Sequence, residues 1–147
     1  MNAAYLDRCL AVIARAGWMV QAVAPHPGQG GHTFCYTVGL TAAGLPEVIV
    51  AGLPVNTGHT LCNTAAQLAL AGELRPGTTN HDIANYPLRI ESAPAAPIIT
   101  AERLYGENQA SAVQLIWPDP NGFYPGDLLW SLRDAQPIYR LTGISHP

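Results

Sequence analysis

The fold is decided by residues 45–72, LPEVIVAGLPVNTGHTLCNTAAQLALAG. Residues 47–51, EVIVA, form a largely apolar run rich in β-branched side chains, which predicts a buried strand. Residues 56–71 follow with apolar side chains at three- and four-residue spacing, which predicts a helix with one buried face. That face consists of Leu61, Ala65 and Leu68.

The segment before this stretch predicts a first helix and a pair of strands. Apolar residues recur at helical spacing over residues 3–16, with Asn2 able to cap the start and Gly17 able to end the helix. Residues 18–24 and 33–39 are predicted strands, joined by a turn rich in Pro and Gly. They are expected to pair as an antiparallel hairpin. One face of the second strand is predicted to carry Phe34, Tyr36 and Val38.

The C-terminal half is expected to add three more strands, over residues 86–92, 97–104 and 111–117. Residues 73–82 are predicted to be a surface loop. The segment WPDPNGFYPGD is predicted to be a second loop, because its three prolines and two glycines cannot continue a strand ladder. Residues 136–144 are expected either to form a final edge strand or to dock on the core.

The resulting order is a helix, several strands, a helix and more strands. Helices do not alternate regularly with strands, so a doubly wound parallel sheet is disfavoured. The sequence predicts an α+β protein with two main helices, about 3–16 and 56–71, and either a mostly antiparallel sheet or a small split barrel. A chain of 147 residues fits a single domain, residues 1–147.

The composition excludes several classes of function. Charged residues make up only 12% of the chain, the seven basic residues are scattered arginines, and the net charge is -3. A nucleic-acid-binding protein needs a clustered basic surface, so no nucleic-acid partner is expected. No apolar run is long enough for a membrane span, and no signal peptide is recognisable, which predicts a cytoplasmic protein without a membrane partner. Low surface charge favours apolar subunit contacts, so a homo-oligomer is expected.

Two similar stretches, GHTFCYT (residues 31–37) and GHTLCNT (residues 58–64), raise the question of a metal site. Their candidate ligands are His32, Cys35, His59 and Cys62. Zinc takes four such ligands in a tetrahedron, but one stretch is predicted to be a strand and the other a helix. The sequence therefore disfavours zinc and predicts reduced, buried thiols. A metal- or thiol-dependent hydrolase remains a minor alternative.

Several motifs together resemble the family called domain of unknown function 4262. Members of that family are similar to this chain in a Gly-Trp segment, a Tyr-Thr-x-Gly-Leu strand end, Pro-Glu, Gly-Leu-Pro and a late Trp-Pro-Asp segment. The matching residues are Gly17, Trp18, Val20, Val23, Phe34, Tyr36, Thr37, Gly39, Leu40, Pro46, Glu47, Gly52, Leu53, Pro54, Trp117, Pro118, Asp119, Gly122 and Pro125. The family more often has Ala at position 35, and it often has Phe-Pro-Trp where this chain has residues 123–126. The resemblance implies a family without an assigned reaction.

A second resemblance is to split-barrel domains of the flavin-reductase type, whose early strand has a similar Thr-x-Gly-Leu end. This resemblance implies flavin as a cofactor. A flavin site would need donors for the phosphate, for example Thr37, Thr41 or Arg89. Fold similarity alone does not establish such a function.

Six polar or aromatic residues are the candidates for ligand binding: Tyr36, Thr37, Glu47, Trp117, Asp119 and Tyr124. Each also has a structural interpretation, such as a core aromatic or a loop-holding aspartate. The functional interpretation places Trp117, Asp119 and the loop 118–127 at the rim of an apolar pocket. Glu47 and Asp119 are expected to be solvated surface acids rather than a catalytic pair. Gly39 and Gly52 are expected to serve backbone geometry at strand ends.

No catalytic constellation and no metal-ligand set is recognisable. The sequence therefore predicts a small, soluble, non-catalytic module that binds a protein partner or a small apolar ligand. The alternative is a split-barrel protein that binds flavin or another small ligand, with an oxidoreductase as one form of it.

Overall fold

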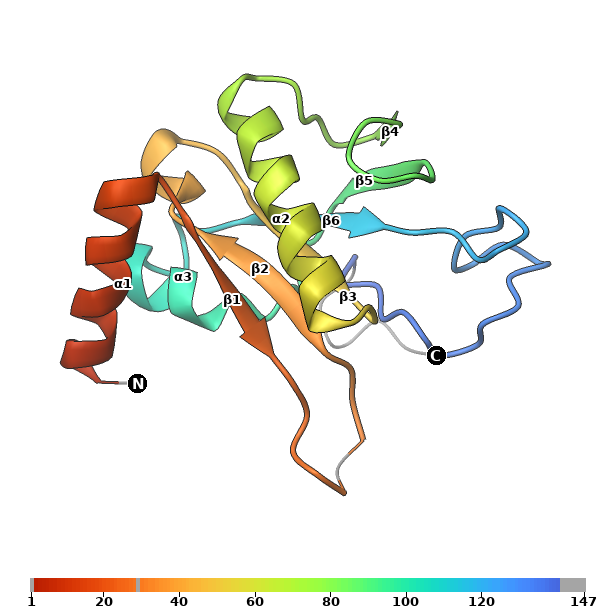
Figure 1. Cartoon of the computed structure of the whole chain (residues 1–147), viewed down its shortest axis with the longest axis horizontal. Helices are drawn as coiled ribbons and strands as arrows, with labels where there is room; N and C mark the ends of the chain where they lie inside the picture. Colours follow the sequence, from red (N-terminus) through yellow and green to blue (C-terminus); the bar gives the residue numbers. More distant parts are fainter. Residues whose placement is uncertain (1, 29, 141–147) are drawn as a thin grey trace.

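A mixed sheet of six strands lies at the centre of the computed structural model, which describes residues 2–28 and 30–140 (Figure 1). The strands are β1 (Met19–Val23), β2 (Phe34–Val38), β3 (Glu47–Ala51), β4 (Thr78–Asn80), β5 (Leu88–Ser92) and β6 (Ala112–Ile116). The helices are α1 (Ala3–Ala16), α2 (Val55–Leu70), α3 (Ile99–Tyr105) and a short 3-10 helix, η1 (Leu40–Ala43).

The strand order is β1-β2-β3-β6-β5-β4, and every pair except one is antiparallel. The exception is the central pair, in which β3 and β6 run parallel. The predicted α+β class with a mostly antiparallel sheet is therefore confirmed, as is the hairpin of β1 and β2. The split-barrel alternative is wrong, because β1 and β4 lie at opposite edges of an open sheet.

The two faces of the sheet are covered by different helices. In Figure 1, α2 lies in front of the sheet, while α1 and α3 lie beside its β1–β2 end. The larger core cluster lies between α2 and the sheet and includes Cys35, Val48, Val50, Leu61, Cys62, Ala65, Val113 and Leu115. The smaller cluster lies on the opposite face and includes Tyr36, Val38, Ile49, Ile98 and Ala101.

The two main helices confirm the predicted positions to within one residue. The side chain of Asn2 accepts a hydrogen bond from Tyr5 N at 2.8 Å, and Gly17 ends α1 in the left-handed conformation. Helix α2 packs closely on β2, because a Cβ atom added at Gly58 would lie 2.8 Å from Cys35 Sγ. None of the helices in the described part of the chain is long and apolar enough to cross a bilayer.

Two predictions in the C-terminal half are wrong. Residues 97–104 were predicted to be a strand because of their β-branched side chains, but the chain turns into α3, where Thr100 and Ala101 are buried against the sheet. The predicted surface loop 73–82 contains β4, which pairs with β5.

The C-terminal segment docks on the core. Residues 136–140 form no strand, and Gln114 on β6 donates to Pro137 O and accepts from Tyr139 N. The rest of the predicted tail, residues 141–144, lies outside the described residues.

Candidate functional site

Glu47 is a fully buried acid at the start of β3, and the prediction of a solvated surface acid is wrong for this residue. Its carboxyl group accepts five hydrogen bonds. The donors are Thr37 Oγ1 (2.8 Å), Gly39 N (3.2 Å), Leu40 N (3.1 Å), Thr41 N (2.9 Å) and Thr41 Oγ1 (2.6 Å). These donors belong to the end of β2 and the beginning of η1. The carboxyl group therefore holds the turn between two strands rather than facing a ligand.

Thr37 completes this junction from β2. Its hydroxyl group donates to Glu47 and accepts from Val48 N at 2.8 Å, so it ties β2 to β3. Gly39, with φ +133°, has the backbone geometry predicted for it, and an added Cβ would lie 2.8 Å from Gly17 O. Thr37 and Thr41 are thus both engaged by Glu47, which leaves neither as the phosphate donor that the flavin resemblance implied.

Trp117 lies at the opposite end of the central strand pair, directly after β6. Its indole Nε1 donates to Ala51 O at 2.8 Å, and its backbone exchanges two hydrogen bonds with the side chain of Gln136. Gly52 directly follows Ala51 at the end of β3 and has φ +84°. Its backbone passes so close to Ala135 that no Cβ would fit. Because β3 and β6 are parallel, Glu47 at the start of β3 and Asp119 beyond the end of β6 lie far apart. The considered pairing of these two acids does not occur.

Asp119 is also buried, with 3% of its surface exposed, so it is not a solvated acid either. Its carboxylate accepts from Asn121 N and Phe123 N at 2.9 and 3.0 Å, and from Ser131 N and Oγ at 3.0 and 2.8 Å. Burial by itself would raise the pKa of the Asp119 carboxyl, but these hydrogen bonds outweigh it and lower the pKa below its ordinary value of 3.8. Asp119 thus fixes both ends of the loop that follows β6.

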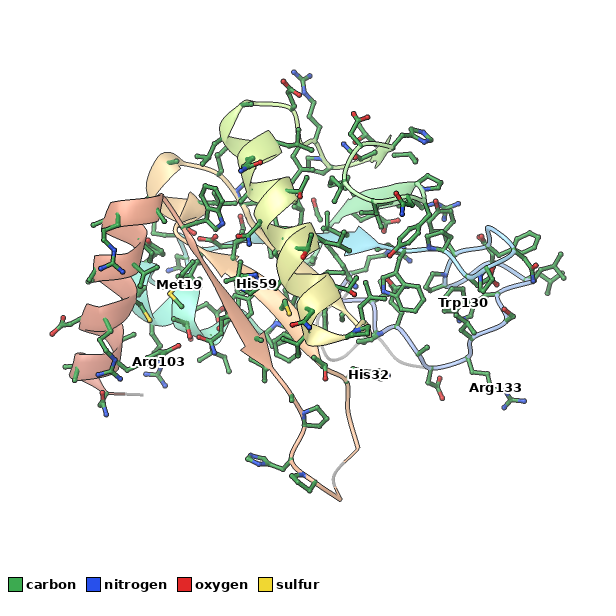
Figure 2. All side chains as sticks on the ribbon, in the orientation of Figure 1. Met19, His32, His59, Arg103, Trp130 and Arg133 are labelled. Atoms are coloured by element: carbon green, nitrogen blue, oxygen red, sulfur yellow. The ribbon has the colours of Figure 1, made fainter. Side chains whose placement is uncertain are left out.

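This loop, residues 118–135, will be called the leucine loop, because Leu128, Leu129 and Leu132 are its exposed apolar residues. In Figure 2 it carries the labelled Trp130 and Arg133 and projects from the sheet on the right. At its base lies an apolar pocket of about 400 Å³. The pocket is lined by Leu53, Tyr86, Trp117, Pro118, Asp119, Pro120 and Leu132. The structure therefore brings Trp117 and Asp119 together at a pocket, whereas the sequence prediction did not identify the leucines themselves.

Tyr124 belongs to the leucine loop but is not one of the residues that line this pocket. Its hydroxyl group donates to Pro87 O at 2.6 Å, and the guanidinium carbon of Arg89 lies 3.9 Å from its ring centroid. Burial raises the pKa of the Tyr124 phenol, and nearby Arg89 counteracts part of that shift. Arg89 stacks on this ring, and its Nη1 lies 4.0 Å from a carboxylate oxygen of Asp127.

Tyr36 lies on the other face of the sheet, away from the leucine loop. It is 2% exposed, and its hydroxyl group accepts from Thr100 N at 2.9 Å. The six candidate residues are therefore distributed over four places, and only Trp117 and Asp119 share a pocket.

The two GHTxCxT stretches do not converge. The ring of His32 contacts Asp134 O, and the exposed His59 bonds Asn63 at 3.1 Å on its own helix. Within residues 2–28 and 30–140, no three His, Cys, Asp or Glu side chains are placed to hold a metal ion. Burial raises the pKa of the Cys35 and Cys62 thiols, which disfavours a thiolate nucleophile.

The family resemblance rests on residues around Glu47, where β2 meets β3, and around Trp117, where the end of β3 meets the end of β6. The sequence profile of a family described as a domain of unknown function, DUF4262, matches residues 12–130. The chain belongs to the DUF4262 family. No curated protein and no solved structure matched it. In this DUF4262 chain, the Tyr-Thr-x-Gly-Leu and Pro-Glu motifs meet at Glu47, and the Gly-Leu-Pro and Trp-Pro-Asp motifs meet at Trp117.

Proposed function

We propose that residues 1–147 form a single, non-catalytic, cytoplasmic domain that binds protein through the leucine loop, and that its first partner is a second copy of the same chain. The observation that carries this proposal is the exposure of three leucines on one loop. Leu128 is 98% exposed, Leu129 62% and Leu132 37%. Clustered exposed apolar side chains of this size are typical of contact surfaces rather than of free monomer surface.

Hydrogen bonds and packing hold the backbone of the loop that carries these leucines. Besides the bonds to Asp119, the Asp127 carboxylate accepts from Tyr124 N at 2.7 Å, and Trp130 Nε1 donates to Arg133 O at 2.8 Å. The ring of Trp130 also packs on Trp117, with the centroids 5.7 Å apart. A surface that is already ordered loses little conformational entropy on binding, which favours a specific contact.

The surface combines projecting side chains with an apolar hollow. Leu128 and Leu129 project from the loop, and Leu132 lines the pocket at the base of the same loop. A two-fold symmetric dimer needs a surface that is complementary to itself, and a projection next to a hollow satisfies this requirement. The exposed neighbours Arg133 and Asp134 carry opposite charges, which suits the polar rim of such an interface.

The non-catalytic part of the proposal rests on what the buried acids do. Glu47 and Asp119 each accept several hydrogen bonds from the backbone of their own turns. A carboxyl group used in this way holds a loop in place and has little accepting capacity left for a substrate.

The test is the mass of the protein in solution, measured by size-exclusion chromatography with light scattering over a range of concentrations. We expect a dimer for the unaltered chain. Each leucine buried in the contact contributes about 2 kcal/mol to the free energy of association, which is about 30-fold in the dissociation constant for each leucine. The double variant Leu128→Ser with Leu129→Ser removes these contributions and should give a monomer.

The matched control is Leu70→Ser, which alters a leucine of 46% exposure at the end of α2, far along the chain from the loop. This variant should remain dimeric, and all variants should keep the circular dichroism spectrum of the unaltered chain. A monomer at the highest concentration for the unaltered chain, or equal dissociation by Leu70→Ser, would refute the proposal.

A further inference from the structure

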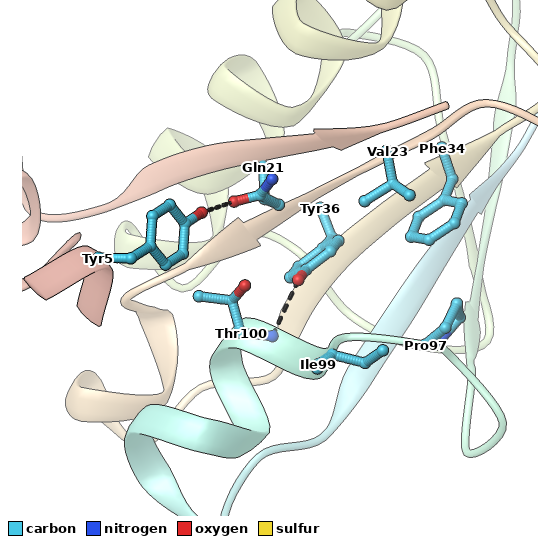
Figure 3. Close-up of a pocket in the computed structure, with 8 residues that line it drawn as sticks. All are labelled: Tyr5, Gln21, Val23, Phe34, Tyr36, Pro97, Ile99 and Thr100. Atoms are coloured by element: carbon cyan, nitrogen blue, oxygen red, sulfur yellow. Dashed lines mark hydrogen bonds between the residues drawn. The ribbon is translucent and has the colours of Figure 1, made fainter. Parts of the chain in front are cut away.

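A second hollow lies on the face of the sheet that α2 leaves free (Figure 3). It measures about 440 Å³ and lies between α1, the β1–β2 hairpin and the turn into α3. Tyr5, Phe34 and Tyr36 supply its aromatic side chains, and it will be called the tyrosine pocket. Ile99, 53% exposed, forms part of its rim. Its volume lies within the range of small-molecule sites, about 300–1,000 Å³.

The strand register explains why these side chains share one face. Gln21 of β1 lies directly opposite Tyr36 of β2, and Val23 lies opposite Phe34. Residues two apart on a strand point to the same side, so all four side chains line one wall. The rings of Phe34 and Tyr36 are stacked with centroids 6.1 Å apart and an angle of 21° between their planes. Phe34 is the partly exposed ring of this pair, and the buried Tyr36 gives it a defined orientation.

Hydrogen bonds hold the polar groups of the pocket in place. Figure 3 shows the Tyr5 hydroxyl group bonded to Gln21 Oε1, and the Tyr36 hydroxyl group accepting from Thr100 N at 2.9 Å. The Tyr36 hydroxyl group accepts in this contact and keeps its own O–H proton, which it can donate either to the neighbouring Thr100 hydroxyl group or to a ligand. Gln21 Nε2 makes only a long contact of 3.4 Å with Ala22 O, which leaves it able to donate to a ligand as well.

The described residues that line the tyrosine pocket carry no charge. Burial raises the pKa of both Tyr5 and Tyr36, so both phenols are protonated at neutral pH. Glu102 and Arg103 line a separate hollow that meets the tyrosine pocket only at Ile99. The nearby guanidinium carbon of Arg8 lies 5.8 Å from the centroid of the Tyr5 ring, outside the lining. The lining itself offers no opposite charge, so a charged ligand would lose hydration against it, whereas a neutral one would not.

We propose that the tyrosine pocket binds a neutral, planar aromatic molecule of one or two rings that carries a hydrogen-bond acceptor. The ring lies against Phe34. The acceptor is bound by the Tyr36 hydroxyl group and the Gln21 amide. This site is independent of the leucine loop, since none of its residues belongs to residues 118–135.

The test is a titration of the ¹⁵N-labelled full chain followed by NMR, with benzamide and three comparison probes. Benzamide is neutral, aromatic and carries a carbonyl acceptor. Benzoate adds a negative charge, benzylammonium replaces the carbonyl acceptor by a positively charged amine, and cyclohexanecarboxamide keeps the amide but lacks the aromatic ring. Benzamide should shift the backbone amide signals of Gln21, Val23, Phe34 and Thr100 in a saturable manner. The other three probes should bind at least about tenfold more weakly, because each lacks one recognised feature.

Two variants connect the binding to the donors. Gln21→Leu keeps a side chain of similar size but removes the amide. Tyr36→Phe keeps the ring but removes the hydroxyl group. Each should weaken benzamide binding about fivefold, the value of one hydrogen bond. Tyr86→Phe, which removes a phenol from the pocket under the leucine loop, is the matched control and should leave the affinity unchanged.

The spectra also show whether each variant is folded, and Gln21→Leu lies on the edge strand β1, where the fold tolerates change best. Equal binding of benzoate or cyclohexanecarboxamide, absence of saturation at millimolar benzamide, or signal shifts centred on residues 118–135 would each overturn the proposal.

Discussion

Replacing Glu47 by glutamine tests whether this carboxyl group holds the junction of β2, η1 and β3. Glutamine keeps one accepting oxygen and places a donating NH₂ group where the other oxygen was. At the Oε1 position the NH₂ group would deprive one backbone amide, Leu40 N, of its acceptor. At the Oε2 position it would deprive two, Gly39 N and Thr41 N, so the first orientation is favoured. A buried amide without an acceptor costs about 1–3 kcal/mol, and we expect Glu47→Gln to lower the free energy of unfolding by that amount.

Glu47→Ala removes the acceptor of all three amides at once. The same reasoning gives a loss of about 3–9 kcal/mol. A domain of this kind has about 5–15 kcal/mol in total, so the alanine variant should lose most of its stability. The large difference between alanine and glutamine distinguishes the loss of acceptors from a general intolerance of change at this position.

The assay is urea denaturation at pH 7, followed by the fluorescence of the three tryptophans and by circular dichroism. Glu73→Gln is the matched control, because the same substitution is made at an exposed position just after α2. If the unfolding free energy of Glu47→Gln lies within about 0.5 kcal/mol of the unaltered chain, the usual range for a surface substitution, the carboxyl group does not organise this junction.

Three further predictions concern Asp119 and the cysteines. The pKa of the Asp119 carboxyl is lowered in the folded state, so its contribution to stability is complete above pH 3.8 and is lost as the pH falls through the lower folded value. The urea midpoints of the unaltered chain and of Asp119→Asn should therefore differ at pH 7 and converge below pH 3.8. A difference that stays constant with pH would contradict this prediction. Gly58→Ala should lower the melting temperature because its Cβ would meet Cys35 Sγ, although alanine favours helices over glycine by about 1 kcal/mol. Adding Cys35→Ala should relieve most of this loss. If Gly58→Ala lowers the melting temperature equally with Cys35 and with Ala at position 35, the contact does not cause the loss. The three cysteines, Cys9, Cys35 and Cys62, are all buried, so a thiol reagent such as DTNB should label none of them until urea is added. Rapid labelling of the native chain would instead support the alternative of a thiol-dependent enzyme.

The elements that were predicted correctly have local causes. Helix α1 has its capping residue, Asn2, and its terminating Gly17 within its own sequence, and the buried strand β3 is recognisable from its composition. Helix α3 was missed because the β-branched Ile98, Ile99 and Thr100 favour a strand locally. The contact that fixes Thr100, to the hydroxyl group of Tyr36, comes from 64 positions earlier in the chain.

The candidate sites were predictable only in part, for the same reason. Trp117 and Asp119 lie within one short motif, so their shared pocket was predicted. The burial of Glu47 was not, since its partners lie on a turn whose path depends on the pairing of β2 with β3. The tyrosine pocket is assembled from α1, β1, β2 and the turn into α3, and no sequence spacing connects Tyr5 with Thr100.

The parallel pairing of β3 with β6 has a consequence for the synthesis of the chain. One edge of the apolar strand β3 is paired with β2 early, but its other edge has no partner until β6 leaves the ribosome. Roughly 60 residues separate the two strands, which corresponds to about 3–12 s at a translation rate of about 5–20 residues per second. During this interval α2 can already cover one face of β3, since it follows that strand directly. During this interval EVIVA thus presents an unpaired apolar strand edge, which is a kind of surface that promotes aggregation of nascent chains.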